Sequence, residues 1–433
     1  MSDTIPESKW KRTVVSGKTA AQVSGKVLKY LVKKPFLKPD EQDNAREDFE
    51  KDSAKEIFKG LVLLKGTALK IAQLLSFELD IIPEAIRKEL EKSYNQVPPI
   101  NKALVRKMIL NAFGESPEAV FSQFDHAAWA AASLGQVHRA TDQTGRELAV
   151  KIQYPGIGKT IKNDLQIVRN LARPTPYSRF VLPVLEEIEI KLMEEIDYIQ
   201  EAENTSFFHN HLKADNVVVP CVIPELSTPT VLTTEYLEGQ SLDQWIADNP
   251  AQEDRDFVAS ILNKQFLESL FSLKCVHADP NPGNFIVMKN LDIGLVDFGC
   301  VKHFSGEFIR LFIDTSRTMI DGDKEQYFES MEKMNVLHSK IDTKTENKIY
   351  KILKKSSEWF CKIYESDTFD FGKHPDFILE GKQIMQETYQ YRKYFKPNPE
   401  FVFLNRTHYG LIRIFEKLKA RVRFVNPHQW QFP

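Results

Sequence analysis

Two neighbouring motifs in the second half of the chain constrain its fold more than any other feature. The first is His277-Ala-Asp279-Pro-Asn-Pro-Gly-Asn284, and the second, Asp297-Phe298-Gly299, begins thirteen residues after Asn284. This order is typical of phosphoryl-transfer sites, in which the first Asp acts as base and the Asn and second Asp bind Mg²⁺. A Pro-rich turn beside a buried strand would explain either motif alone. Together they predict Asp279 as the catalytic residue and Asn284 and Asp297 as metal ligands.

A lysine upstream is the candidate phosphate ligand. Lys151 lies in Leu148-Ala-Val-Lys-Ile152, which resembles the third strand of a protein kinase. Strand alternation places Lys151 on the face opposite Val150 and Ile152. A lysine on this face can neutralise the α- and β-phosphates of ATP or ADP when a carboxylate positions it.

The carboxylate is expected on a helix that runs through Glu194–Asn204. Helical spacing places Glu194, Asp197 and Glu201 on one face, whereas Glu195 is rotated by about 100°. Such an acidic face is more often a solvated surface. The lysine upstream and the Asp-Phe-Gly motif downstream favour Glu201 as the partner of Lys151.

An alanine-rich segment precedes the lysine where kinases carry a glycine-rich loop. It reads Ala130-Ala131-Ala132-Ser133-Leu-Gly135, and such a segment alone is usually a turn of helix. Glycines in this loop let backbone N–H groups approach phosphates without a Cβ in the way. Three alanines keep the loop small but restrict its backbone, so we expect it to hold the nucleotide in a different way.

These motifs together resemble the UbiB family, the aarF-domain-containing atypical kinases linked to ubiquinone. The resemblance covers roughly residues 55–305 and also includes Asp197-Tyr-x-x-Glu-Ala-x-Asn204 and Glu235-Tyr-x-x-Gly239. It implies an α+β, bilobal protein-kinase-like fold with a small β-rich N-lobe, a helical C-lobe and an N-terminal helical extension. It further implies that Lys151 pairs with Glu201 and that Glu235–Leu237 offers backbone groups to adenine.

The family also carries a Lys-x-Gly-Gln signature in its helical extension. The corresponding residues here are Lys70-Ile-Ala72-Gln73, with alanine in place of the glycine. Lys70 and Gln73 are three residues apart and therefore share a helix face. The resemblance implies that they cover the nucleotide site and that Lys70 meets the acidic Glu195-x-Asp197 segment. The methyl group of Ala72 is expected to shift this lid outward.

The chain divides into four predicted segments. They are a basic N-terminal segment at 1–40, the helical extension at 41–125, the N-lobe at 126–238 and the helical C-lobe at 239–433. Residues 43–77, 102–124 and 158–212 are expected to be mostly helical. Strands are expected at 134–140, 146–152, 217–223, 230–236 and 291–296, and no extended activation segment follows Gly299.

The composition of the chain limits the partners and the cellular location that we expect for it. The net charge of −2 over 433 residues gives no general attraction to nucleic acid, and the four cysteines are scattered in a way that suits a reducing compartment. No run of eighteen apolar residues occurs, so we expect a cytoplasmic protein without a transmembrane helix. The first forty residues carry nine Lys or Arg and three Asp or Glu. This basic segment predicts peripheral membrane contact, with docking on the chain's own acidic surface as an equal alternative.

Three functions fit these features. The first is an ATP- and Mg²⁺-dependent atypical kinase or ATPase that acts on a small or lipid-like substrate. The second is a small-molecule phosphotransferase similar to the aminoglycoside enzymes, which also lack an activation segment. The third is a nucleotide-binding regulatory pseudokinase. Lys70, Gln73 and the alanine-rich segment favour the first, and the intact Lys151, Asp279, Asn284 and Asp297 argue against catalytic silence.

The alanine-rich segment generates a prediction. Replacing Ala132 with glycine should change the preference between ADP and ATP, because the backbone gains freedom where it meets the phosphates. Titration of the purified variant with each nucleotide in the presence of Mg²⁺ measures this preference. Unchanged affinities for both nucleotides would contradict the expected role of the segment.

Overall fold

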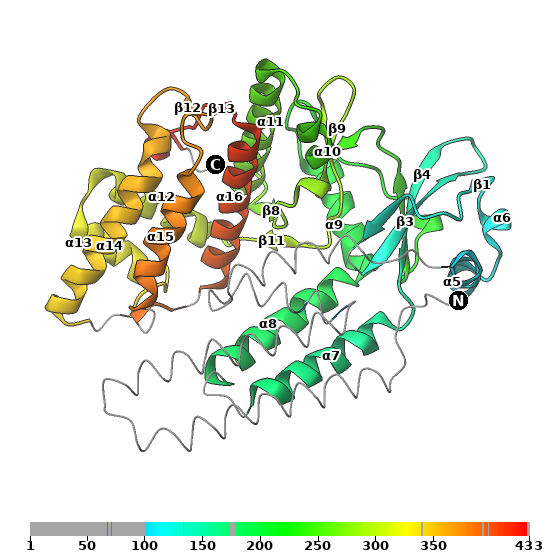
Figure 1. Cartoon of the computed structure of the whole chain (residues 1–433), viewed down its shortest axis with the longest axis horizontal. Coiled ribbons are helices and arrows are strands. Elements are labelled where there is room, and N and C mark those ends of the chain that lie inside the picture. The colour runs from blue at the N-terminus through cyan, green and yellow to red at the C-terminus, as the bar shows by residue number, and fades with distance from the viewer. Residues whose placement is uncertain are drawn as a thin grey trace. The chain divides into compact units, whose positions relative to one another are not determined.

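The computed structural model describes Thr67, Ile71 and residues 101–132, 134–173, 178–338, 341–391, 394–396 and 398–430. The chain folds into two compact α+β units (Figure 1). Of the described residues, unit 1 contains those up to Ala202 together with Val222–Tyr236, and unit 2 contains Glu203–Cys221 and those from Leu237 onward. The basic N-terminal segment, Lys70, Ala72, Gln73 and Ser133 lie outside the described residues.

Unit 1 is built on a five-stranded antiparallel sheet with the order β1-β3-β4-β6, in which β2 also pairs with β3. The strands are β1 (Gln123–Phe124), β2 (Ala130–Ala132), β3 (Gly135–Thr141), β4 (Glu147–Gln153) and β6 (Val231–Glu235). The described helices of this unit are α5 (Lys102–Phe113), α6 (Pro117–Val120), α7 (Ile157–Ala172), α8 (Ser178–Glu195) and the first turn of α9 (Tyr198–His211).

One face of the sheet forms the core of unit 1. Leu148, Val150 and Ile152 of β4 are each at most 1% exposed and pack in one cluster with Val105 and Ile109 of α5. Burying each of these side chains contributes about 2 kcal/mol. The alternation predicted for this strand is confirmed, because Lys151 belongs to the opposite face.

The helix expected over residues 102–124 is shorter than predicted. Gly114 takes a left-handed φ of 78° at the end of α5, and its N–H donates to Leu110. Pro117 then begins the single turn of α6, and β1 follows. A helical sequence pattern did not reveal this glycine C-cap.

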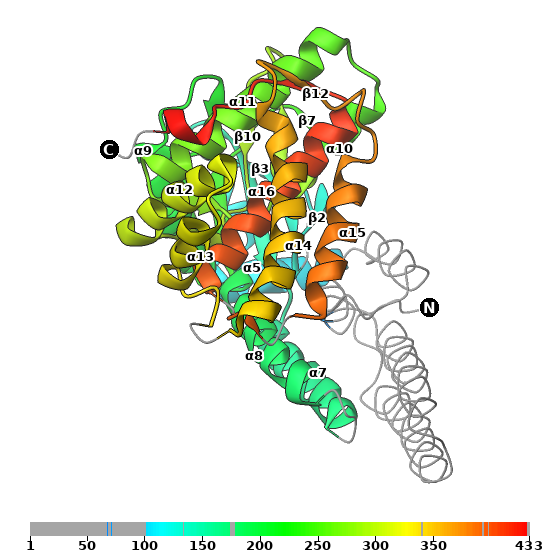
Figure 2. The ribbon, with the colours of Figure 1, turned by 90° about the vertical axis from the view of Figure 1, so that its left-hand side faces the viewer.

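Unit 2 is mainly helical and carries three small sheets, with the strand orders β5-β10-β9-β7, β11-β8 and β12-β13. Its strands are β5 (Val217–Val218), β7 (Gln240–Ser241), β8 (Cys275–His277), β9 (Phe285–Val287), β10 (Ile293–Leu295), β11 (Val301–His303), β12 (Phe369–Asp370) and β13 (Arg421–Val422). Its helices besides the rest of α9 are α10 (Leu242–Ala247), α11 (Gln252–Phe271), α12 (Gly306–Asp321), α13 (Lys324–Lys333), α14 (Thr343–Cys361), α15 (Phe377–Tyr389) and α16 (Pro399–Leu418). Figure 2 shows α14, α15 and α16 side by side.

The strand expected over 217–223 is wrong as a single element. Val217 and Val218 pair in parallel with β10 of unit 2, whereas Val222 forms an isolated bridge with Thr234 of unit 1. Pro220 lies between them and has no N–H to donate to a ladder. The chain therefore passes from one unit to the other within this apolar run.

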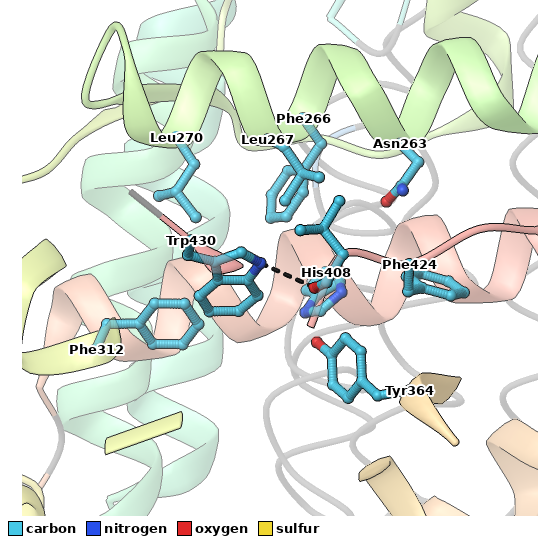
Figure 3. A pocket seen from close by; sticks show the side chains of 10 residues that line it. Asn263, Phe266, Leu267, Leu270, Phe312, Tyr364, His408, Phe424 and Trp430 are labelled. Carbon is cyan, nitrogen blue, oxygen red and sulfur yellow. Dashed lines mark hydrogen bonds between the residues drawn. The ribbon is translucent and has the colours of Figure 1, made fainter. Parts of the chain in front are cut away.

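A small cavity lies in the core of unit 2 and has a volume of about 10 Å³, which is room for about one water. Figure 3 shows its lining, in which the Trp430 indole donates a 2.9 Å hydrogen bond to the Val425 carbonyl. His408 of α16 lines it and stacks on Phe266 with ring centroids 5.3 Å apart. Burial lowers the pKa of His408 to about 4.

The lowered pKa of His408 predicts sensitivity of the fold to acid. The folded pKa of His408 lies below its ordinary value of about 6.5, so the unfolded chain binds more protons between these values. The contribution of neutral His408 to stability is complete above pH 6.5 and is lost as pH falls toward 4. His408→Phe should flatten the pH dependence of the unfolding free energy, measured by urea titration between pH 7 and 5. The matched control His338→Gln replaces an exposed histidine, and an equal flattening there would refute the assignment.

Candidate functional site

Lys151 of β4 and Glu201 of α9 form a buried ion pair in unit 1. The ammonium group donates to both carboxylate oxygens, at 2.8 and 2.9 Å, and the two side chains are 13% and 2% exposed. The Lys151 ammonium also lies 5.2 Å from the ring centroid of Tyr198. The pairing of Lys151 with Glu201 that the resemblance implied is therefore present in the structure.

The helix expected through Glu194–Asn204 is broken. Glu195 is the last residue of α8, and Tyr198 is the first of α9. Asp197 separates them and caps α9, because its carboxylate accepts the N–H of Gln200 at 3.1 Å and its carbonyl accepts that of Glu201. Aspartate is among the preferred N-cap residues. The cap restarts the helix, so the single acidic face predicted across Glu194, Asp197 and Glu201 does not form.

The alanine-rich segment is a strand rather than a loop. Ala130, Ala131 and Ala132 form β2 and pair with Val137, Gln136 and Gly135 of β3. A Cβ on Gly135 would lie 2.5 Å from the Ile152 carbonyl oxygen and 2.8 Å from the Tyr198 hydroxyl, so only glycine fits there. The tight β2–β3 connection is thus held against the strand that carries Lys151.

The loop that carries Asp279, the predicted catalytic residue, lies in unit 2 between β8 and β9 and is called the catalytic loop below. His277 ends β8, and a short 3₁₀ turn, Pro282–Asn284, leads into β9. Asn281 caps this turn by accepting the Gly283 N–H at 3.0 Å. Asn284 is 8% exposed, and its amide nitrogen donates to the Asp279 carboxylate at 3.0 Å and to the Asp279 carbonyl at 3.2 Å. The structure therefore brings Asp279 and Asn284 into direct contact.

Asp297 follows β10 and has a left-handed φ of 63°. The ring nitrogen Nε2 of His277 lies 2.9 Å from the Asp297 carbonyl and donates to it, and the Val296 N–H donates to the Asn284 carbonyl at 3.0 Å. Phe298 is fully buried and packs on Phe208, with centroids 5.0 Å apart. These contacts join the Asp-Phe-Gly segment to the catalytic loop.

The described residues offer chemistry that suits Mg²⁺. Because the amide nitrogen of Asn284 donates to Asp279, its carbonyl oxygen Oδ1 is the atom left to bind a cation. Mg²⁺ takes oxygen ligands and is usually held by one or two protein groups together with phosphates and waters. No cluster of three or more His, Cys, Asp or Glu side chains arranged for a metal occurs in the described ranges. A two-ligand site at Asn284 and Asp297 fits this pattern.

The Asp-Phe-Gly segment continues directly into a helix. β11 pairs with β8, and Ser305 caps α12 by accepting the Phe308 N–H at 3.1 Å. Only the residues from Cys300 to Ser305 separate Gly299 from α12. The extended activation segment that would hold a peptide is absent from this stretch.

The remaining residues predicted to bind the nucleotide lie at the end of β6 and directly after it. Glu235 is the last residue of that strand in unit 1, and the Tyr236 N–H donates to the Glu147 carbonyl at 3.0 Å. Leu237 belongs to unit 2, where it lies close to Gly294 of β10. The chain thus passes between the units within Glu235–Leu237.

The structure adds one residue that the sequence did not indicate. Arg406 of α16 places a guanidinium nitrogen 3.9 Å from Asp279 Oδ1, and their side chains are 35% and 38% exposed. Four residues later, Gly410 packs against Pro280, because a Cβ on Gly410 would lie 2.1 Å from the proline ring. α16 therefore lies directly against the catalytic loop.

Comparison with known proteins identifies the family. The ABC1 atypical kinase-like domain matches residues 92–331, more than half of the chain. The chain belongs to this family. Relatives include the probable serine/threonine-protein kinase abkA of Dictyostelium discoideum, 29% identical over 86% of this chain and 69% of its own length. The mitochondrial atypical kinase COQ8 of Saccharomyces cerevisiae is 32% identical over 57% of this chain. The predicted UbiB resemblance is confirmed.

The chain spans 50% of the length of yeast COQ8. Among solved structures, Rv3197 of Mycobacterium tuberculosis, determined as a complex with erythromycin, superimposes with a TM-score of 0.61 at 24% identity. The match covers 88% of this chain and 96% of the other. The predicted α+β kinase-like fold is therefore confirmed.

The buried ion pair generates a prediction about stability. Glu201→Leu leaves the Lys151 ammonium without its carboxylate in a nearly buried position, which should lower the unfolding free energy by about 3 kcal/mol. The double variant Lys151→Met/Glu201→Leu should recover at least half of this loss. Urea unfolding measures both, and Glu147→Gln at the exposed Arg139–Glu147 pair is the control. A loss below about 1 kcal/mol in Glu201→Leu, as expected for an exposed pair, would contradict the prediction.

Proposed function

We propose that this chain is a UbiB-type atypical kinase or ATPase that binds Mg-ATP and transfers or hydrolyses its terminal phosphoryl group. The proposal rests on one observation above all. Asn284 donates to Asp279 through its side chain and accepts from Val296 through its carbonyl, next to Asp297. The base and both proposed metal ligands are thus assembled within unit 2.

The proposed reaction assigns a role to each of these groups. Asn284 and Asp297 would hold Mg²⁺, which neutralises charge on the β- and γ-phosphates. Asp279 orients the attacking hydroxyl or water and accepts its proton. The bond between the γ-phosphorus and the bridging oxygen breaks, its electron pair leaves on ADP, and the attacking oxygen bonds to phosphorus.

Unit 1 contributes residues to nucleotide binding in this proposal. Lys151, oriented by Glu201, contacts the α- and β-phosphates, and the predicted contacts of Ala130, Ala131, Ala132 and Ser133 with the nucleotide stay predictions. The backbone of Glu235 and Leu237 binds adenine. Lys70 and Gln73 act as a lid whose acidic partner is Glu195, which stays a prediction.

The acceptor is proposed to be small or lipid-like. A peptide needs an extended surface beside the base, and here α12 begins soon after Gly299. Family membership supports a role in ubiquinone or other isoprenoid-lipid metabolism. Within the described part of the chain, no helix combines the length and the hydrophobicity that a bilayer span requires. Membrane contact through the basic N-terminus and a cytoplasmic location stay predictions, and yeast COQ8 is named as mitochondrial.

The alternative functions differ in what they require of the same residues. An aminoglycoside-type phosphotransferase would use Asp279 in the same way on a small hydroxylated acceptor. A regulatory pseudokinase would bind nucleotide without turnover. The pairing of Lys151 with Glu201 and of Asp279 with Asn284 favours a catalytic protein over the pseudokinase.

Two variants separate binding from turnover. Asp297→Asn should weaken Mg-ATP binding, because it removes a negative charge from the metal site, whereas Asp279→Asn should largely spare binding. Both should abolish turnover. Calorimetric titration with Mg-ATP and phosphate release, with and without candidate prenyl-phenols and anionic liposomes, measure the two properties. Wild-type turnover in Asp279→Asn would overturn the proposed function.

A further inference from the structure

The catalytic loop lacks a cation. Residues 279–284, Asp-Pro-Asn-Pro-Gly-Asn, contain no lysine or arginine. The phosphoryl group in transfer carries negative charge on three equatorial oxygens, and phosphotransfer sites commonly place a cation against it. A side-chain cation that acts on this group in addition to Mg²⁺ would therefore come from another element.

Helix α16 is held firmly against this loop. Gly410 permits contact with Pro280 that any larger residue would prevent. Near the start of the helix, the Glu400 carboxylate accepts the Ser305 N–H at 2.7 Å, which ties α16 to the beginning of α12. The backbone of α16 is thus fixed relative to Asp279 on both sides of Arg406.

Arg406 points its guanidinium at Asp279. It precedes Gly410 by four residues and therefore shares the helix face that meets the loop. The 3.9 Å separation from Asp279 Oδ1 exceeds a hydrogen-bond distance. None of the described residues accepts a hydrogen bond from Arg406. The N–H groups of the Arg406 guanidinium are therefore available to bind a ligand beside Asp279.

A purely structural ion pair accounts poorly for this placement. Both side chains are about one-third exposed, and a pair of this kind contributes about 0–1 kcal/mol. A guanidinium, in contrast, matches phosphate geometry because two parallel N–H groups bind two oxygens. Lys302 of β11 lies 5.6 Å from the Phe403 ring centroid and already has a partner.

We propose that Arg406 binds the phosphoryl group in transfer beside Asp279 and stabilises its charge in the transition state. α16 thereby supplies, from the end of the chain, the cation that the catalytic loop lacks. The inference rests on the proposed function and deepens it, because it adds a catalytic residue to the same site. The bonds that form and break are those described above for Asp279, and Arg406 contributes positive charge and hydrogen bonds but takes no part in proton transfer.

The test uses the full chain and three nucleotide ligands. Arg406→Gln should lower kcat for Mg-ATP hydrolysis about 100-fold, as loss of one charge-stabilising donor does in other sites. Its affinity for Mg-ADP should stay within about twofold, because the terminal phosphoryl group is absent. Its affinity for Mg-ADP with aluminium fluoride, which mimics that group in transfer, should fall at least tenfold. Arg406→Lys should retain part of this affinity, since it keeps the charge but loses the fork.

Controls separate direct contact from indirect effects. Arg413→Gln removes an exposed cation from the same helix and should match wild type, and circular dichroism confirms folding of each variant. In an Asp279→Asn background, Arg406→Gln should still weaken the fluoroaluminate complex. If it does not, Arg406 acts only through Asp279 and the proposal fails. Equal losses for Mg-ADP and the fluoroaluminate complex, or a kcat within threefold of wild type, would also overturn it.

The same experiments distinguish a failure of the proposed function from a failure of the Arg406 proposal. A wild-type chain that binds neither Mg-ADP nor its fluoroaluminate complex would refute nucleotide chemistry at this site, and the Arg406 proposal with it. Normal binding of both ligands by Arg406→Gln, with hydrolysis still dependent on Asp279, would refute only the role of Arg406.

Discussion

The backbone pairing between the catalytic loop and the Asp-Phe-Gly segment is the constraint on which the site depends. β8 and β11 pair antiparallel, the Ala278 N–H donates to the Cys300 carbonyl at 2.9 Å, and Val296 donates to Asn284. Each bond contributes about 1 kcal/mol, which together exceeds the cost of order 1 kcal/mol for the left-handed backbone of Asp297. Two motifs separated in sequence thereby become one rigid substructure, with His277 joining its two halves.

Most of this substructure could be predicted because its residues are close in sequence and chemically restricted. The order of Asp279, Asn284 and Asp297 is typical of phosphoryl-transfer sites, and the alternation around Lys151 follows from the period of a strand. Lys151 and Glu201 are fifty residues apart in the sequence. Their pairing could still be predicted, because a lysine that binds phosphates needs a carboxylate to position it. In each case a local rule and a chemical requirement agree.

The predictions that failed concerned the positions at which helices and strands begin and end. The periodicity of Glu194–Asn204 suits one helix, but the Asp197 carboxylate caps a new helix and rotates the residues that follow. Pro220 divides an apolar run that reads as one strand. Gly114 ends α5 because its backbone adopts the left-handed conformation. The intrinsic propensities of residues predict the interior of a helix or strand. Its boundary is decided by a single residue, such as a capping side chain, a left-handed glycine or a proline without an N–H.

The proposed role of Arg406 could not be found from the sequence because it depends on packing. One arginine on an amphipathic helix near the end of a chain is ordinary, and its nearest functional residue lies far upstream. What distinguishes it is Gly410, whose missing side chain lets α16 approach Pro280. Close approach fixes the helix axis, and the axis fixes the direction of a long side chain one turn earlier. No extended segment intervenes between Gly299 and α12, and α16 packs directly against the loop that carries Asp279. The proposed role of Arg406 therefore follows from the position of α16, which places a guanidinium 3.9 Å from Asp279.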